Sequence, residues 1–232
     1  MKAKLLVLLF FYVTLIISCS KSSEGSPETI EEKQLIKVEK PKKKSKKKVS
    51  KDSLNPKNLV AFFTEYGKQN PETRVLIETK YGKIRLELYE DTPIHRANFV
   101  FLAKNGFFDT TIFYRVSEDF VIQGGNSEQL VTAQFKNKYR NYTLPPEMEN
   151  KHTHHYGALA AARRYEGNPG KRSNAFEFYI IQGREGAHHL NNEHTVYGKV
   201  LSGWSAIDKI AKLETGSDEW PKEDVYMKVT VF

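Results

Sequence analysis

The chain has 232 residues, a formal net charge of +8 at pH 7 and a single cysteine, Cys19. One cysteine excludes an intramolecular disulfide and a dithiol redox function. Residues 1–53 account for +7 of the net charge, so residues 54–232 are nearly neutral and the basic composition does not predict a nucleic-acid-binding face.

The first residues predict a targeting segment. Lys2 and Lys4 precede an apolar run over residues 5–17, which is shorter than a membrane-spanning helix and typical of a secretory signal. The run ends in IISCS, which resembles the lipobox of bacterial lipoproteins, with Cys19 at the position that receives the lipid. We therefore expect residues 1–18 to be a lipoprotein signal peptide. Cys19 would anchor the protein to a membrane of the bacterial cell envelope, with its domain facing the periplasm or the exterior. The alternative is an ordinary signal peptide with an incidental cysteine.

Residues 19–53 predict a disordered stalk. Residues 20–53 include 11 Lys and 6 acidic residues and no aromatic side chain, so this segment cannot bury enough apolar surface to offset the entropy lost on ordering. Its KPKKKSKKK run is interpreted either as a solvated spacer or as a membrane-surface patch, which would gain about 1 kcal/mol per lysine near anionic headgroups. Behind a secretory signal the run does not indicate a nucleic-acid partner.

Residues 54–232 predict one domain of mainly β structure. A short helix over residues 55–67 is followed by a strand pair over 75–80 and 83–90. The next helix has Thr92 as its cap, Pro93 in its first turn and Gly106 at its end. Apolar runs between Gly, Asn and Pro predict antiparallel strands of a barrel or sandwich at 111–116, 120–123, 157–162, 177–181 and 195–201. A second long helix over 203–213 and an alternating strand over 225–232 complete the domain.

Strand alternation predicts a pocket on one face of the sheet. Residues two apart share a face, so Phe113 and Arg115 point one way while Tyr114 and Val116 point the other. If the strands are neighbours, one surface combines an apolar floor with polar groups, formed by Arg115, Val121, Gln123, Glu177 and Tyr179. Such a surface is typical of a ligand site, and a guanidinium there is costly unless it is paired or functional.

Four motifs resemble those of the cyclophilins, a family of peptidyl-prolyl cis-trans isomerases. FYRVSEDFVIQGGN, at residues 113–126, resembles the family signature, and GALAAAR, SNAFEFYI and HLNNEHTVYGKV follow in the family's order. The resemblance covers residues 73–232 and implies an eight-stranded antiparallel barrel capped by two α-helices, with the helix at 55–67 as an extra N-terminal element. It implies an enzyme that rotates Xaa-Pro bonds in unfolded or partly folded polypeptides without a cofactor or metal. Because of the targeting segment we expect its substrates to be exported proteins, and we expect the protein to be a monomer.

The resemblance also implies the site residues. Arg115 matches the catalytic arginine and Gln123 the glutamine that orients it. The residues that match the proline pocket are Phe120, Val121, Tyr179, Leu190 and His194. Ala162 and Arg163 match the strand whose backbone binds the substrate chain, and Glu177 lies beside Arg115 in the substrate-binding groove. A fixed guanidinium that donates a hydrogen bond to the prolyl nitrogen gains most when the amide is twisted, which stabilises the transition state.

Several positions depart from the family pattern. Tyr114 replaces a histidine, and on strict alternation it lies on the opposite face and should matter little. Glu177 replaces a glutamine, and its carboxylate would either damp the donation of Arg115 or fix its pose. His189 replaces the tryptophan that contacts cyclosporin in many members, so we expect weak inhibition, which a nanomolar inhibition constant would contradict. Val121 replaces a methionine and Arg163 an asparagine.

Two other functions stay open at this point. A peptide-binding or chaperone module would use the same groove without turnover, and Arg115 would then be held in a salt bridge with Glu177. An envelope scaffold would work through its lysine-rich stalk.

Two further patterns do not predict sites. The histidines fall into two groups, His152, His154, His155 and His188, His189, His194. Neither group has carboxylate or thiolate partners at a recognised metal-ligand spacing, as is usual for solvated loop histidines. Gly124 and Gly125 lack the helix and the lysine of a phosphate-binding loop, and a turn that ends the strand would explain them.

Overall fold

The computed structural model describes residues 54–55, 57–140 and 142–232. The predicted signal peptide, the lipidation site at Cys19 and the lysine-rich stalk lie outside these residues. Within the described part of the chain, no helix combines the length and the apolar character that crossing a bilayer requires.

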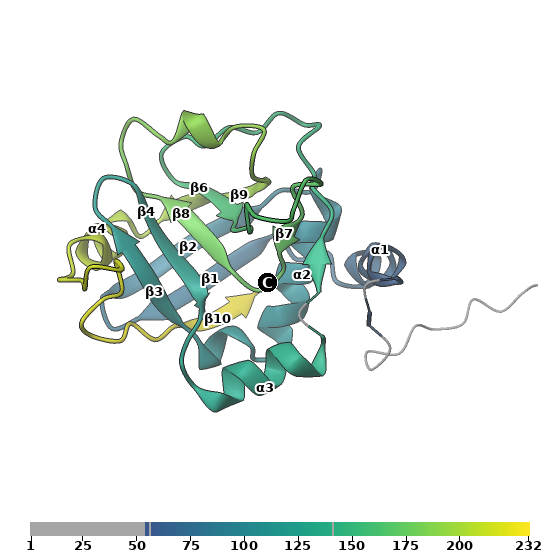
Figure 1. Ribbon diagram of the computed structural model, residues 1–232, viewed down its shortest axis with the longest axis horizontal. Coiled ribbons are helices and arrows are strands. Elements are labelled where there is room, and N and C mark those ends of the chain that lie inside the picture. The colour runs from purple at the N-terminus through teal and green to yellow at the C-terminus, as the bar shows by residue number, and fades with distance from the viewer. Residues whose placement is uncertain (1–53, 56, 141) are drawn as a thin grey trace, which may run out of the picture. The chain divides into compact units, whose positions relative to one another are not determined.

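One curled sheet of eight strands forms the body of the domain (Figure 1). The strands lie in the order β10-β1-β2-β9-β6-β8-β4-β3, and every neighbouring pair is antiparallel. Their bounds are β1 (Arg74–Thr79), β2 (Gly82–Leu88), β3 (Ile112–Ser117), β4 (Val121–Asn126), β6 (Ala158–Ala161), β8 (Phe178–Ile181), β9 (Val196–Ser202) and β10 (Lys228–Val231). Strands β5 (Thr143–Leu144) and β7 (Ser173–Asn174) form a separate sheet. The mainly β, antiparallel fold is therefore confirmed.

The two edges of the large sheet meet through the segment that precedes β10. Tyr226 bridges the start of β3, and the Phe113 N–H donates to the Val225 carbonyl at 3.0 Å. The same segment then enters β10 and pairs with β1. The predicted alternation over 225–232 is real, because Val225, Met227 and Val229 are buried. The regular strand is shorter than predicted because its pairing changes from β3 to β1 partway along.

Four α-helices occur in the described residues, namely α1 (Leu59–Gln69), α2 (Pro93–Lys104), α3 (Leu130–Lys138) and α4 (Trp204–Ala211). Two short 3-10 turns, η2 (Phe108–Thr110) and η3 (His188–Leu190), lie in loops. Helix α2 contacts β10, and α4 contacts β2, β3 and β4, on opposite sides of the strands in Figure 1. The sequence does not predict α3, because Thr132 is the one buried residue of this helix and no apolar stripe marks it.

The N-terminus of α2 is capped by a side chain distant in sequence. Pro93 occupies the first turn as predicted, but the Thr92 hydroxyl donates to a main-chain carbonyl at 3.2 Å and does not cap the helix. Glu147 instead accepts the main-chain N–H groups of Ile94 and His95 at 3.0 and 2.9 Å. A carboxylate at this end satisfies N–H groups that have no partner within the helix, and the helix dipole favours it. Thr92 therefore occupies the predicted cap position, but its side chain does not supply the capping hydrogen bond.

Helix α1 packs on α2 through aromatic rings. Phe62 and Phe63 meet Phe101 of α2 edge-on, with ring centroids 5.6 and 5.8 Å apart, and Tyr66 lies 5.4 Å from the same ring. Edge-to-face contacts are a favourable geometry for aromatic pairs. Leu54 and Leu59 are buried in the same cluster, so the N-terminal helix belongs to the core of the domain.

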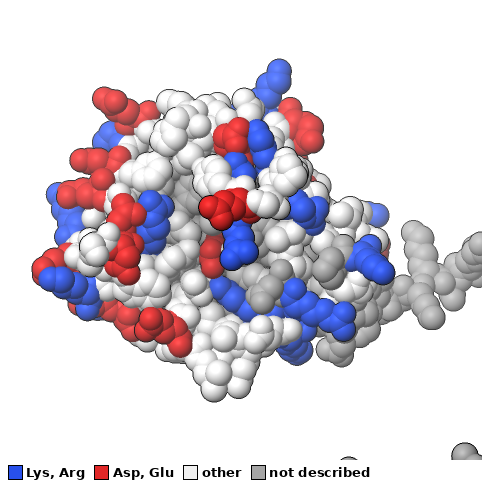
Figure 2. Space-filling view, in the orientation of Figure 1, with Lys and Arg blue, Asp and Glu red and all other residues white. Residues whose placement is uncertain are grey.

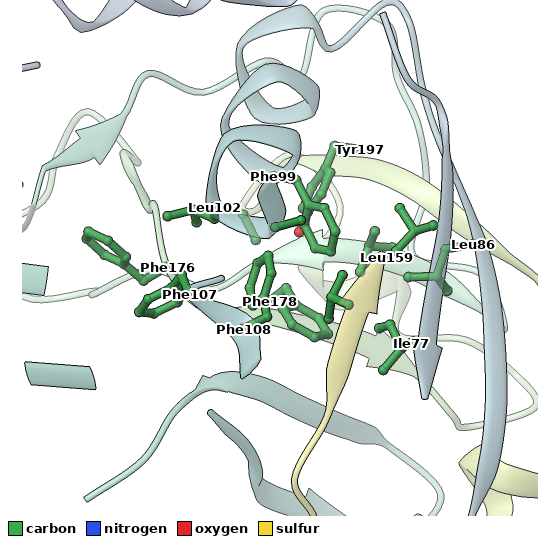
Figure 3. Close-up of a cluster of buried hydrophobic side chains, with 14 of the residues drawn as sticks. Ile77, Leu86, Phe99, Leu102, Phe107, Phe108, Leu159, Phe176, Phe178 and Tyr197 are labelled. Carbon is green, nitrogen blue, oxygen red and sulfur yellow. The ribbon is translucent and has the colours of Figure 1, made fainter. Parts of the chain in front are cut away.

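The core lies inside the curl of the sheet, whereas a second apolar cluster covers part of its outer face. Figure 3 shows core residues from several strands and from α2, including Ile77, Leu86, Phe99, Leu102, Phe107, Phe108, Leu159, Phe176, Phe178 and Tyr197. Alternate residues of β4, β6, β8 and β9 point outward and form the second cluster, which includes Val121, Ala158, Ala160, Tyr179, Ile181 and Val196. Strands β6 and β8 are buried on both faces, which explains their continuous apolar runs.

Gly124 and Gly125 lie inside β4 and not in a turn that ends it. Gly124 pairs with Phe178 of β8. Gly125 has φ +93°, and a Cβ at this position would lie 2.0 Å from the carbonyl oxygen of Phe176. Glycine is needed here because the backbone adopts a conformation that other residues avoid and closely approaches the segment that precedes β8. The interpretation of the pair as a turn is therefore wrong.

Candidate active site

A hollow of about 330 Å³ lies over the outer apolar cluster. Its floor holds small side chains such as Ala162 beside the larger Val121 and Tyr179, so room is left above the sheet. The residues that line it are Arg115, Phe120, Val121, Gln123, Ala162, Arg163, Tyr165, Tyr179, His189, Leu190 and His194. The structure thus brings together nine of the ten residues predicted for the site, and the tenth, Glu177, lines an adjoining hollow.

A β-bulge in β3 places two consecutive side chains on the outer face. The register between β3 and β4 shifts between Phe113 and Arg115, so that two residues of β3 lie opposite Gln123. Phe113 and Val116 therefore point into the core, while Tyr114 and Arg115 both point outward and contact Gln123. The expectation that Phe113 and Arg115 share a face is wrong, because a bulge breaks the two-residue period.

Arg115 contacts three groups around the hollow. Its Nη1 donates to Gln123 Oε1 at 3.4 Å, and its guanidinium lies 5.8 Å from the centroid of the Phe120 ring. Its Nε donates to Glu219 Oε2 at 2.6 Å. The side chain is 35% exposed, so a ligand in the hollow can reach the guanidinium. This arrangement offers a permanent positive charge and N–H donors at the edge of an apolar site.

Glu177 does not pair with Arg115. Its carboxylate accepts from Lys136 Nζ at 3.2 Å and from the Tyr114 hydroxyl at 3.2 Å. Tyr114 in turn accepts a hydrogen bond from the side-chain amide of Gln123. Burial, together with the nearby Glu177 charge, raises the pKa of Tyr114, so its hydroxyl stays protonated. The predicted Arg115–Glu177 contact is wrong, because Glu177 pairs with Lys136 and Tyr114. The expectation that Tyr114 lies on the opposite face is also wrong, because the bulge turns it outward.

A network of histidines and tyrosines supports one side of the hollow. His194 is 7% exposed, its Nδ1 donates to the Ala161 carbonyl at 3.0 Å, and its Nε2 accepts from the Tyr165 hydroxyl at 2.9 Å. Beneath the floor, His154 is fully buried and lies 2.9 Å from the Tyr179 hydroxyl. Burial lowers the pKa of His194, and it lowers the pKa of His154 to about 4. These two histidines are therefore neutral and buried, not solvated.

The main chain beside the hollow presents hydrogen-bonding groups at one residue. The Ala162 N–H donates to the Glu177 carbonyl at 3.1 Å, and the Ala162 carbonyl accepts from the Asn174 N–H at 2.7 Å. The main-chain N–H and carbonyl of Arg163 have no partner among the described residues. Its side chain is held by Glu193 at 2.6 Å and lies 4.2 Å from the Tyr165 ring centroid. Of the two residues predicted to bind a substrate backbone, Arg163 has its groups available.

A larger hollow of about 740 Å³ adjoins the first and shares Gln123, Ala162 and Arg163 with it. Lysine and arginine side chains outnumber carboxylates among its lining residues, whose charged members are Lys136, Arg163, Arg164, Glu166, Arg172 and Glu177. Figure 2 shows that both signs of charge also occur over this view of the domain, which agrees with its nearly neutral composition.

Sequence reasoning missed five contributors, Tyr114, Lys136, His154, Tyr165 and Glu219. Tyr114 is missed because a bulge has no signal in an apolar–polar pattern. The other four lie in loops or in α3, where no periodicity places a side chain against a strand. His154 was named only within a group of histidines considered as a metal site, and no cluster of three or more metal-ligating side chains occurs in the described residues.

Comparisons with known proteins agree with this geometry. The family model described as cyclophilin type peptidyl-prolyl cis-trans isomerase/CLD matches residues 74–231. The chain is 33% identical over 167 residues to the peptidyl-prolyl cis-trans isomerase cypE of Dictyostelium discoideum, which covers 68% of this chain and 97% of that protein. A longer relative from Streptococcus pyogenes, whose name includes peptidyl-prolyl cis-trans isomerase, is 30% identical over 183 residues, and the match covers 67% of this chain but 37% of the relative.

A solved structure supports the fold. The cyclophilin type peptidyl-prolyl cis-trans isomerase of Cryptosporidium parvum superposes with a TM-score of 0.57 at 22% identity, covering 69% of this chain and 98% of that one. A further crystal structure of that protein was determined in the presence of the dipeptide Ala-Pro. Together with the family model and the relatives, these findings show that the chain belongs to the cyclophilin-type peptidyl-prolyl cis-trans isomerase family.

Proposed function

We propose that the protein accelerates cis-trans isomerisation of Xaa-Pro bonds in exported polypeptides, with Arg115 as the catalytic residue. The observation that carries the proposal is the Arg115 guanidinium at the edge of a hollow of about 330 Å³ with apolar side chains in its lining. Phe120, Val121 and Leu190 supply apolar surface for the ring, and the Arg163 main chain supplies a donor and an acceptor for the substrate backbone.

The chemistry requires stabilisation of a twisted amide. Rotation about an Xaa-Pro bond meets a barrier of about 18–20 kcal/mol because amide resonance must be broken, and without catalysis it takes tens to hundreds of seconds. In the twisted state the prolyl nitrogen regains a lone pair. A guanidinium N–H that donates to this lone pair binds the twisted amide more strongly than the planar one, so it lowers the barrier.

The residues around Arg115 fit this role without moving a proton. A guanidinium is a permanently charged donor, and rotation forms and breaks no σ bond, so neither a nucleophile nor a general base is required. Gln123 accepts from Arg115 Nη1 and acts as a positioning residue. Tyr114 fixes Gln123 by accepting a hydrogen bond from its amide.

The test is an isomerisation assay on a short Xaa-Pro peptide with the full-length protein and its Arg115→Ala variant. A hydrogen bond to a charged group contributes about 1.5–3 kcal/mol, so we expect kcat/KM to fall about 10- to 100-fold. Arg115→Lys is the matched control, because it keeps the charge and loses the planar donor fork. Binding of the peptide without acceleration by the wild type would instead identify a non-catalytic peptide-binding module.

We also propose that Cys19 is lipidated and holds the protein in the bacterial cell envelope, with residues 19–53 as a stalk. Support comes from the apolar run over residues 5–17, the IISCS sequence and the lysine-rich composition that follows. Incorporation of labelled palmitate in growing cells, lost in Cys19→Ala, is the expected result, and equal labelling of both would refute it. Deletion of residues 21–53 tests the scaffold alternative, which predicts loss of cellular function while isomerase activity persists.

We further propose that the domain acts as a monomer. Sedimentation of the full-length protein in detergent is expected to give the mass of a single chain after correction for bound detergent, and a dimer mass would contradict this.

A further inference from the structure

Among the described residues, the shortest side-chain hydrogen bond of Arg115 is with Glu219, which lies 104 positions further along the chain. Arg115 Nε and Glu219 Oε2 are 2.6 Å apart, and the two side chains are 35% and 39% exposed. Neither strand alternation nor the family resemblance points to this residue. The contact occupies Nε, on the side of the guanidinium that is nearest the backbone, and leaves the terminal nitrogens for Gln123 and for a ligand.

The loop that holds Glu219 is fixed to the strand that holds Arg115. The Glu219 carbonyl accepts the Val116 N–H at 2.9 Å, directly beside Arg115 in β3. Within the loop, the Gly216 N–H donates to the Trp220 carbonyl at 2.8 Å, and Thr215 bridges Pro221. The backbone at Glu219 is therefore held in place by main-chain hydrogen bonds, which fixes the point from which its carboxylate reaches Arg115.

Glu219 adopts a backbone conformation that its residue type disfavours. Its φ is +62°, in the left-handed region where a non-glycine residue is strained by about 1–2 kcal/mol. Glycine would adopt this conformation without strain. Strained residues persist where the surrounding structure enforces them, and they cluster at functional sites.

We propose that Glu219 is a positioning residue that locks the Arg115 guanidinium so that its terminal N–H groups face the proline hollow. The inference rests on the proposed catalytic role of Arg115. Two acceptors, Glu219 at Nε and Gln123 at Nη1, define the plane of the guanidinium, while the Phe120 ring limits its movement from one side. A donor fixed before the substrate arrives loses no orientation entropy in the transition state.

Ionisation supports this role. A hydrogen bond from Ser117 and the contact with Arg115 lower the pKa of the Glu219 carboxyl. The carboxylate is therefore charged at neutral pH, where it accepts strongly from the guanidinium.

The test separates positioning from structural support by replacing Glu219 with glycine in the full-length protein. Glu219→Gly removes the carboxylate and also relieves the left-handed strain, so the thermal midpoint is expected to stay at or above that of the wild type. The kcat on an Xaa-Pro peptide is expected to fall about tenfold or more with KM changed less than about twofold, since a misplaced catalytic group can cost up to a hundredfold. Glu219→Gln keeps an acceptor oxygen for Nε and is expected to retain most of the activity.

Two variants serve as matched controls. Glu214 lies in the same loop and pairs with Lys222, so Glu214→Gln removes a carboxylate without touching Arg115. Lys151 has φ +58°, so Lys151→Gly relieves the same strain away from the hollow. Both are expected to keep the wild-type kcat.

Three outcomes would overturn the inference or its basis, and they are distinguishable. An unchanged kcat in Glu219→Gly, with an active wild type that Arg115→Ala disables, overturns the role of Glu219 alone. A kcat that falls only together with the thermal midpoint shows a structural role. An inactive wild type overturns the proposed function. The NMR signal of Arg115 Nε–H then shows whether Glu219 holds the guanidinium in one orientation. A single sharp signal that broadens or averages in Glu219→Gly supports the lock, and an identical signal in both proteins refutes it.

Discussion

Acidification should destabilise the protein through His154. This side chain is fully buried under the floor of the proline hollow. Asn191 Oδ1 accepts the His154 main-chain N–H at 2.8 Å and lies 3.0 Å from Nδ1, so Nδ1 carries the ring proton. The Tyr179 hydroxyl, 2.9 Å from Nε2, then donates to that nitrogen. A second proton on the ring would force the Tyr179 hydroxyl to change from donor to acceptor and would bury a charge.

The size of the effect follows from the pKa difference between the folded and unfolded states. Burial lowers the pKa of His154 from 6.5 to about 4, so between these values the unfolded chain binds a proton that the folded protein does not. Stability therefore rises with pH in this window, is fully present above about pH 6.5, and is lost as pH falls toward 4. Such a gap corresponds to about 3 kcal/mol. His194, whose pKa is also lowered by burial, acts in the same direction.

Urea unfolding of the full-length protein between pH 7 and pH 4.5 measures this loss. His154→Gln cannot titrate, so its stability is expected to fall by about 2–3 kcal/mol less than that of the wild type over the range. His155 is exposed, and His155→Gln is the matched control that should keep the wild-type slope. Equal pH slopes for the wild type and His154→Gln would refute the reasoning.

Two further substitutions test the framework around the site. Glu147→Ala removes the acceptor of two main-chain N–H groups at the start of α2 and of the buried His95 ring. Urea unfolding is expected to show a loss of about 2–4 kcal/mol in the free energy of unfolding. A loss under about 1 kcal/mol would contradict the capping role. Gly125→Ala places a Cβ 2.0 Å from the Phe176 carbonyl oxygen at φ +93°, so a loss above about 3 kcal/mol is expected. Gly106→Ala is its control, because φ is +71° but nothing lies within 4 Å, and about 1 kcal/mol is expected there; equal losses at both glycines would contradict the close approach.

The regular elements were predictable where packing imposes a period. Helix α4 buries Ala206, Ile207, Ile210 and Ala211 at helical spacing, and β2 buries Ile84, Leu86 and Leu88 at strand spacing, so both appear in the sequence pattern. Helix α3 buries only Thr132. An element whose residues face solvent leaves no apolar signature, and its existence depends on contacts that the chain makes elsewhere.

The residues that line the site were predictable from the sequence, but the hydrogen-bond and ion-pair partners of their side chains were not. The family resemblance places Arg115 and Gln123 together, and the structure agrees. The partners of Arg115 and Glu177 were not predictable, because they are chosen by three-dimensional proximity. Lys136 of α3 forms an ion pair with Glu177, and Glu219 of a distant loop forms one with Arg115. A one-residue bulge was enough to move Tyr114 onto the outer face, and no pattern of residue types encodes it.

The aromatic contact between α1 and α2 determines where a truncated form of this protein can begin. The family match begins at residue 74, yet Phe62 and Phe63 cover the Phe101 side of α2. A recombinant fragment trimmed to the family boundaries would bare that aromatic surface, and exposed apolar patches promote association. Poor solubility of such a fragment would reflect the loss of the aromatic side chains of α1 and not low stability of the β-sheet. The working unit for biochemistry on this protein therefore starts before α1, at a boundary that the family pattern does not mark.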